Sequence, residues 1–190
     1  MQNIINKLGI NKIINIKSEV LFREAEDDFY YFNHLNKAMK KLKEAVNLTP
    51  NHLKSIMLYA DICFIKGYFN KALSLYLTAE KIRSKDSKIL ASLANCYNSL
   101  KKSKEAVMYC DMAINSMIEI NYSLFSQLIE IKINNLINLK KYKEAYITFI
   151  QSQNILDTAS LKNIYTSDYE IINEKLKLQK KVHYLGLKIV

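Results

Sequence analysis

The sequence predicts an all-α protein built as a solenoid of repeated helical hairpins. Ala38, Ala72 and Ala106 are equally spaced, and each begins a stretch of similar pattern. Each is followed two helical turns later by a second alanine: Ala45, Ala79 and Ala113. A fixed period of about 34 residues, with helical spacing inside each period, is typical of repeat arrays. No alternation typical of β-strands accompanies it, so we expect repeats that stabilise one another by stacking.

Residues 1–18 precede the repeats and are predicted to form an amphipathic tail or a capping helix. They are basic through Lys7, Lys12 and Lys17 and lack the continuous apolar core of a signal peptide. A role at a membrane surface is an alternative for this segment. We expect the repeats over 19–152, in copies at about 19–52, 53–86, 87–120 and 126–157.

The first copy is clearest in its second helix. Its first helix carries Phe22, Ala25 and Phe29. Its second helix carries Ala38, Leu42, Ala45 and Leu48. Pro50, the single proline of the chain, follows at once. Because proline cannot continue a helix, it separates this copy from the next.

The second and third copies are the best matches to the pattern. In the second, Gly67 and Asn70 mark a turn between two helices. Its apolar and small residues fall on one stripe of each helix: Ile56, Tyr59, Ala60, Cys63, Ala72, Leu75, Tyr76, Ala79 and Ile82. The third copy repeats the stripe with Leu90, Leu93, Ala94, Tyr97, Ala106, Cys110 and Ala113. Small residues are expected where helices cross, since larger side chains hold the backbones apart.

The fourth copy is degenerate, and a closing helix is expected after it. Tyr142, Ala145 and Phe149 match the second helix, but Ala145 comes five residues later than the period would place it. We place the five extra residues in a longer connection around 118–123. In the C-terminal segment, 158–190, Ser167 and Glu170 have the form of a capping box, which predicts a capping helix over 167–185.

This pattern resembles the tetratricopeptide repeat (TPR) family. The matching residues of the second copy are Ile56, Tyr59, Ala60, Cys63, Gly67, Phe69, Ala72, Tyr76 and Ala79. The resemblance implies a right-handed α-α superhelix whose first helices line a concave groove. It also implies a groove lined by Asp27, Lys54, Met57, Asp61, Phe64, Lys88, Asn95, Asn98 and Asn134.

Four of these residues hold equivalent positions and form a polar column, namely Asp27, Asp61, Asn95 and Asn134. A carboxamide both donates and accepts hydrogen bonds, so the asparagines could pair with the backbone of an extended peptide. The alternative is ordinary solvated residues in an asparagine-rich chain. Met57 and Phe64 would add an apolar patch, unless Phe64 packs into the neighbouring repeat.

Chaperone-binding members of the family clamp a C-terminal carboxylate with basic residues and asparagines. Arg23 and Lys88 match two clamp positions, but Asp27, Leu58 and Ser92 stand at the other three. An aspartate there repels a carboxylate. We therefore expect no binding of an acidic C-terminal tail.

Composition argues against several other classes of function. The net charge is +10, but Arg23 and Arg83 are the only arginines and the lysines are scattered, so we expect no specific nucleic-acid binding. No stretch is long and apolar enough for a membrane span. The three cysteines have no CxxC spacing, which suits buried thiols in the cytoplasm. His34, His52 and His183 lack ligand spacing, so we expect no metal and no cofactor.

No nucleophile and base pair stands out, so we expect no enzyme. The predicted function is that of a non-catalytic adaptor or scaffold that binds a peptide or protein segment in the groove. Two alternatives stay open: a dedicated chaperone for a secreted client, similar to those of type III secretion, and an accessory subunit of a larger complex.

Overall fold

The computed structural model describes residues 2–158, and all regular secondary structure within that range is α-helical. The chain divides into two compact units, Met1–Ile118 (unit 1) and Glu119–Val190 (unit 2). The closing helix predicted over 167–185 lies outside the described residues.

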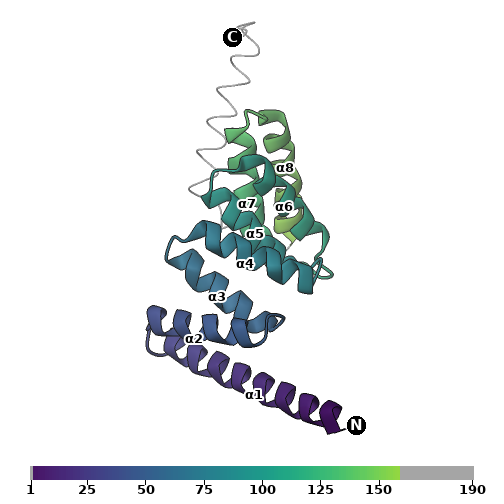
Figure 1. The fold of residues 1–190 in the computed structure, drawn as a ribbon. Coiled ribbons are helices and arrows are strands. Elements are labelled where there is room, and N and C mark those ends of the chain that lie inside the picture. The colour runs from purple at the N-terminus through teal and green to yellow at the C-terminus, as the bar shows by residue number, and fades with distance from the viewer. Residues whose placement is uncertain (1, 159–190) are drawn as a thin grey trace, which may run out of the picture. The chain divides into compact units, whose positions relative to one another are not determined.

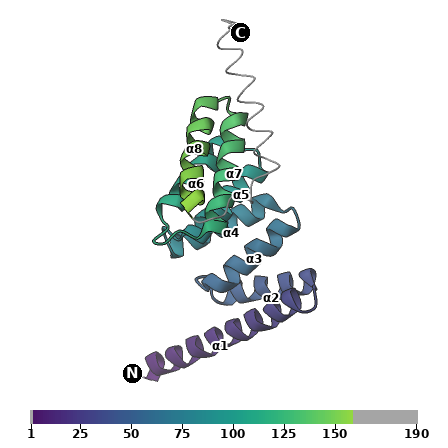
Figure 2. The same cartoon turned by 180° about the vertical axis from the view of Figure 1, so that it is seen from behind.

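Unit 1 consists of three consecutive helical hairpins, which Figures 1 and 2 show from opposite sides. The helices are α1 (Gln2–Tyr30), α2 (Leu35–Leu48), α3 (Leu53–Ile65), α4 (Phe69–Ile82), α5 (Ser87–Ser99) and α6 (Ser103–Asn115). Each helix packs against the next one in the chain, and α1 also contacts α3. The all-α repeat architecture predicted from the alanine spacing is confirmed.

The alanines that define the period are fully buried. All six have no exposed surface: Ala38, Ala45, Ala72, Ala79, Ala106 and Ala113. Larger apolar side chains fill the space around them, and Leu42, Ile56, Leu90 and Leu93 are at most 1% exposed. A methyl side chain lets two helix backbones approach closely, whereas a longer one would hold them apart. The alanines therefore recur in the sequence because each lies where two helices pack closely.

The connections between hairpins end one helix and start the next with specific residues. Pro50 lies in the turn between α2 and α3, as predicted. At the start of α5, the Asp86 carboxylate accepts hydrogen bonds from the amides of Lys88 (3.0 Å) and Ile89 (3.2 Å). Such a cap satisfies amide groups that have no partner inside the helix.

The turns inside three of the four described hairpins, those after α3, α5 and α7, repeat one backbone conformation. Gly67, Lys101 and Lys140 have φ values of 75°, 59° and 58°. In each turn that residue's amide bonds back three residues, and the next amide bonds back five, as in a Schellman motif. Only Gly67 is a glycine, the residue that adopts this left-handed conformation without steric cost. The two lysines hold it because the flanking helices fix the turn.

Helix α1 differs from the prediction at its N-terminal end. It is a single helix of 29 residues, so the boundary expected at residue 18 lies inside it. Toward its middle, the Ser18 hydroxyl donates to the carbonyl of Ala45 at 3.1 Å, and Thr49 donates to Asn15 at 3.4 Å. These bonds join α1 to the C-terminal end of α2. The segment 1–18 is thus continuous with the first repeat helix and is no separate element.

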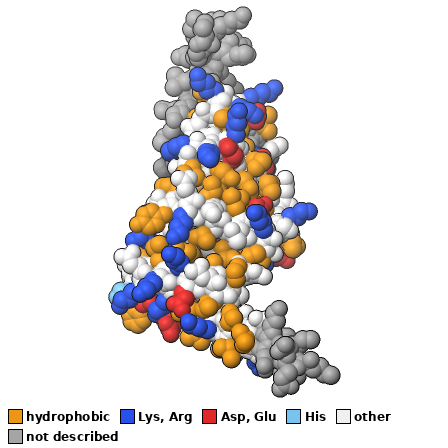
Figure 3. All heavy atoms as spheres, viewed as in Figure 1, with side chains coloured by type: hydrophobic (Ala, Val, Ile, Leu, Met, Phe, Trp, Pro, Cys, Tyr) orange, Lys and Arg blue, Asp and Glu red, His pale blue; other side chains and the backbone are white. Residues whose placement is uncertain are grey.

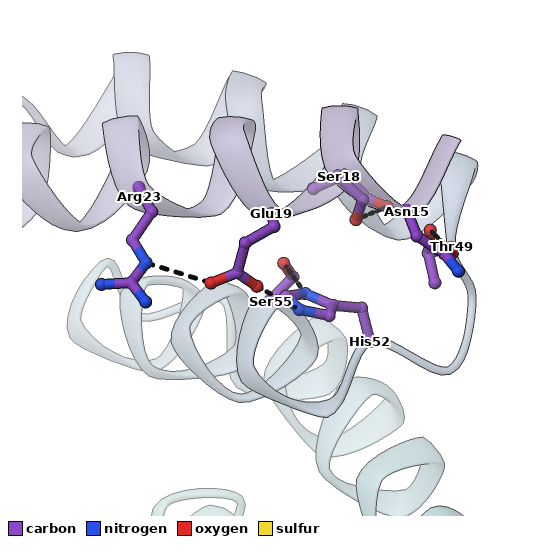
Figure 4. Close-up of polar contacts among 8 residues, drawn as sticks. Asn15, Ser18, Glu19, Arg23, Thr49, His52 and Ser55 are labelled. Atoms are coloured by element: carbon purple, nitrogen blue, oxygen red, sulfur yellow. Dashed lines mark hydrogen bonds and ion pairs between the residues drawn. The ribbon is translucent and has the colours of Figure 1, made fainter. Parts of the chain in front are cut away.

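A polar junction centred on His52 joins α1 to the start of α3 (Figure 4). One ring nitrogen of His52 lies 3.0 Å from a Glu19 carboxylate oxygen, and the other lies 2.6 Å from the Ser55 hydroxyl. Arg23 donates to the other Glu19 oxygen at 3.0 Å. The Phe22 ring meets the imidazole edge-on at 5.6 Å. Hydrogen bonds from Arg23 and then His52 hold the pKa of Glu19 below its ordinary value. The stability that Glu19 adds to the junction is therefore lost as the pH falls and its carboxylate is protonated.

Unit 2 contains one described hairpin, formed by α7 (Tyr122–Asn138) and α8 (Tyr142–Thr158). Its core is apolar: Phe125, Leu128, Ile129, Ile133, Leu136, Ala145 and Phe149. The buried Asn135 amide donates to the carbonyl of Ile131 at 2.8 Å. Asn121 caps α7 by accepting from the Leu124 amide at 3.1 Å.

The extra residues of this copy lie mostly in a helix. Helix α7 has 17 residues, whereas α3 and α5 have 13 each. The connection before α7 is residues 116–121, only two residues longer than the connections before α3 and α5. The longer connection predicted around 118–123 is therefore wrong in the main, because the isoleucine-rich sequence of α7 continues the helix by another turn.

Replacing Ala72 by leucine tests the close packing. The Ala72→Leu substitution forces a larger side chain between helices, so we expect the free energy of unfolding to fall by about 1–3 kcal/mol. The matched control is Ser74→Leu, which adds the same residue at an exposed position of the same helix. We expect that control to change stability by less than about 0.5 kcal/mol. Urea denaturation followed by circular dichroism measures both, and equal losses would contradict the packing account.

Candidate functional site

The candidate site is the outward side of α1, α3 and α5, which we call the first-helix face. Eight of the nine predicted groove residues lie on these three helices, all in unit 1, and all are at least partly exposed. They are Asp27, Lys54, Met57, Asp61, Phe64, Lys88, Asn95 and Asn98. The ninth, Asn134, is exposed on α7 of unit 2, so its membership of one continuous column stays a prediction.

Three of these residues occupy the same position in successive repeats. Asp27, Asp61 and Asn95 lie one repeat period apart on α1, α3 and α5. Asp27 is exposed, while Asp61 and Asn95 are each partly buried. The repeat period therefore places one short polar side chain on each first helix, in more protected surroundings after the first.

The cationic and apolar members of the face are held by neighbours. The Lys54 ammonium lies 5.9 Å from the centre of the Phe22 ring, within the range of a cation–π contact. The ring of Phe64 packs edge-on against Phe69 of its own hairpin, with 5.3 Å between ring centres. Met57, which also lies on α3, is partly exposed. Lys88 projects from the first turn of α5 and is exposed.

Asp61 is the most constrained polar residue of the face. Its Oδ1 accepts a hydrogen bond of 2.5 Å from the hydroxyl of Tyr76, a core residue of α4 that is only 3% exposed. Burial, followed by the nearby Asp61 charge, raises the pKa of the Tyr76 hydroxyl well above its ordinary value. The carboxyl group of Asp61, at the surface, is thus hydrogen-bonded to the hydroxyl of a core tyrosine.

The surroundings of Asp61 disfavour its charge. Burial raises the pKa of the Asp61 carboxyl, and the hydrogen bond from Tyr76 only partly opposes that effect. Burial, followed by the nearby Asp61 charge, raises the pKa of the Cys96 thiol to about 12. Among the described residues, no lysine, arginine or histidine forms an ion pair with Asp61.

Sequence reasoning places Asp61 on the face but misses its link to the core. The pattern predicts Tyr76 only as an apolar stripe residue of the second helix. The Tyr76 hydroxyl reaches Asp61 because α3 and α4 pack side by side. The number of residues between Asp61 and Tyr76 in the sequence does not predict this contact. A tyrosine on a buried stripe needs a polar partner, and that requirement was the available signal.

Other candidate chemistry has little support in the described part of the chain. Cys63, Cys96 and Cys110 are buried and form no disulfide, and burial raises the pKa of the Cys63 thiol. A thiol with a raised pKa is a poor nucleophile. Among the described residues, no group of three or more histidine, cysteine or acidic side chains could hold a metal ion. None of the helices described is both long and apolar enough to cross a membrane.

A pocket that the sequence did not indicate lies at the turn between α1 and α2. Its lining comes from that turn and from the end of α3: Asn33, His34, Leu35, Asn36, Lys37 and Lys66. The Lys66 ammonium donates to the side-chain amide oxygen of Asn36 at 2.8 Å, so it is already engaged. In the view of Figure 3, lysine and arginine side chains are spread over the surface rather than gathered in one patch.

The cost of holding Asp61 ionised predicts the effect of Asp61→Asn on stability. Asparagine keeps an acceptor for Tyr76 but carries no charge, so we expect the free energy of unfolding to rise at neutral pH. The raised pKa makes the cost complete above the folded-state pKa, and it disappears as the pH falls toward the ordinary value of 3.8. Urea denaturation across that range measures the gain. A loss of stability at neutral pH would contradict it, and the exposed Asp27→Asn serves as the control.

Comparison with known proteins gives the fold a name. No protein-family model matches the sequence, and no curated protein matches it. Solved structures do match. The first TPR of Spaghetti (RPAP3), bound to the HSP90 peptide SRMEEVD, is 17% identical with a TM-score of 0.56, over 62% of this chain and 91% of that one.

Two further structures extend the likeness. YrrB, a TPR protein with an unusual peptide-binding site, is 15% identical with a TM-score of 0.61, over 70% of this chain and 66% of its own. The MamA protein is 10% identical with a TM-score of 0.66, over 92% of this chain and 98% of its own. Identities this low establish the fold alone. The chain has the tetratricopeptide-repeat fold that its alanine period predicts.

Proposed function

We propose that this protein is a non-catalytic protein-interaction module that binds a peptide or protein segment along the first-helix face of unit 1. The observation that carries the proposal is the recurrence of one partly or fully exposed polar residue at the same position of α1, α3 and α5. A row of fixed donors and acceptors on a rigid scaffold suits an extended chain, whose backbone groups also recur regularly.

Neighbouring side chains on this face supply the other contacts that such a ligand needs. The carboxamides of Asn95 and Asn98 can each donate and accept hydrogen bonds. Met57 offers an adaptable apolar surface for one anchor side chain. Lys54 and Lys88, which are both exposed, offer charge for the rim. RPAP3, whose first TPR was solved with a peptide, supports the use of this fold for segment binding.

The finer parts of the proposal follow from composition. Three buried cysteines that form no disulfide suit a reducing compartment such as the cytoplasm. An adaptor or scaffold role fits a fold that presents a row of exposed and partly exposed polar residues on its first helices. Asn134, which is exposed on α7 of unit 2, stays a prediction from the sequence and is tested separately by its own alanine substitution.

A random peptide display selection tests the proposal. The triple variant Lys54→Ala/Met57→Ala/Asn95→Ala removes a cation, an apolar contact and a carboxamide from the first-helix face. We expect it to bind the selected peptides at least about tenfold more weakly than the wild type, because a few interface side chains carry most of the binding free energy. A tenfold loss corresponds to about 1.4 kcal/mol.

The control removes the same three residue types from exposed positions of the second helices. It is the triple variant Asn47→Ala/Lys81→Ala/Met108→Ala. We expect its affinities to stay within about twofold of the wild type. The proposal is wrong if the wild type selects no peptide, or if the two triple variants lose affinity equally.

An acidic C-terminal tail is expected not to bind. The peptide SRMEEVD, which RPAP3 holds, ends in a glutamate pair, a valine and an aspartate carboxylate. In this chain Asp27 is exposed where the family's clamp has a donor, and Leu58 is only 6% exposed. We expect no saturable binding below about 1 mM in isothermal titration calorimetry. A micromolar Kd would contradict this.

A further inference from the structure

Two carboxylates of unit 1 that are buried or partly buried, Asp28 and Glu19, are matched by cations, whereas Asp61 is not. Asp28, which is 7% exposed, pairs with Lys41 at 2.9 Å and faces His34 at 3.4 Å. Glu19 pairs with Arg23 and His52, each at 3.0 Å. Asp61 receives a hydrogen bond only from the neutral hydroxyl of Tyr76.

The hydrogen bond from Tyr76 fixes the direction of the Asp61 carboxyl group. Tyr76 is a buried residue of α4, so its hydroxyl is held by the core. That donor occupies Oδ1, and no described residue donates a hydrogen bond to Oδ2. The side chain of Asp61 remains partly exposed, so the free oxygen can be reached from the first-helix face. The carboxyl group is therefore a preorganised acceptor with one open site.

A desolvated carboxylate without a cation is unfavourable, and a cation brought by a ligand would offset that cost. A water molecule or a neutral amide can donate a hydrogen bond but cannot match the charge. We propose that Asp61 selects a basic residue, lysine or arginine, in the segment that unit 1 binds, by pairing with its side chain. This inference rests on the proposed function and assigns the chemical class of its ligand.

The next repeat shows that asparagine is accepted at the position of Asp61. Asn95 holds the position of Asp61 on the next first helix, one repeat period later, and it too is partly buried. Asp61→Asn thus places at α3 a residue that the same fold already accepts at α5. Asp27, at the equivalent position of α1, is exposed to solvent, where an ion pair contributes little.

The test measures the coupling between Asp61 and a basic ligand residue. Peptides selected from a random display library on the wild type are synthesised with each lysine or arginine, in turn, replaced by glutamine. For one position we expect glutamine to weaken binding to the wild type by about tenfold or more. In Asp61→Asn that preference should fall to within about twofold. In the control Glu44→Gln, which removes a carboxylate from an exposed position of the second helix α2, the preference should stay as in the wild type.

Each outcome supports or contradicts a distinct statement. A wild type that selects no peptide contradicts the proposed function, and this inference with it. Peptides that bind without a basic residue, or whose preference for one persists in Asp61→Asn, contradict this inference and leave the proposed function standing. Circular dichroism establishes that each variant is folded. As an independent readout, carboxyl NMR titration should show the pKa of Asp61 falling when the basic peptide binds.

Discussion

The close packing of paired helices through fully buried alanines is the constraint on which the rest of unit 1 depends. Two alanines in each second helix have no exposed surface, and the repeat period keeps them in the same relation to each first helix. Because a methyl group is all that fits, each hairpin has one permitted geometry. Residues at equivalent positions of α1, α3 and α5 therefore recur at a fixed interval along the chain.

That interval separates the residues that build the fold from those that are free to bind. Changes at the position of Asp27, Asp61 and Asn95 alter the charge of the face without entering the alanine contacts. Asp61 illustrates what such freedom permits, because Tyr76 connects it to the core while its second oxygen stays open. A carboxylate held at a cost to stability is the kind of residue that binding, rather than folding, explains.

The alanine period was sufficient to predict the helical hairpins. It did not predict features that depend on contacts between residues distant in the sequence or on the local backbone conformation. It could not show that α1 runs unbroken through residue 18, since the isoleucines and asparagines there carry no capping signal. It missed the left-handed conformation of Lys101 and Lys140, which sequence ordinarily signals with glycine. Most of the candidate face followed from equivalent positions. The hydrogen bond between Tyr76 and Asp61 did not, because it depends on how α3 and α4 pack.

Mapping a selected peptide onto the protein by amide NMR tests the central claim, that unit 1 binds its ligand on the first-helix face. The account predicts that the largest chemical-shift changes fall on α1, α3 and α5, around Met57, Asp61 and Asn95, with small changes on the exposed sides of α2, α4 and α6. Changes concentrated on the second helices, or on the turn between α1 and α2, would contradict the account.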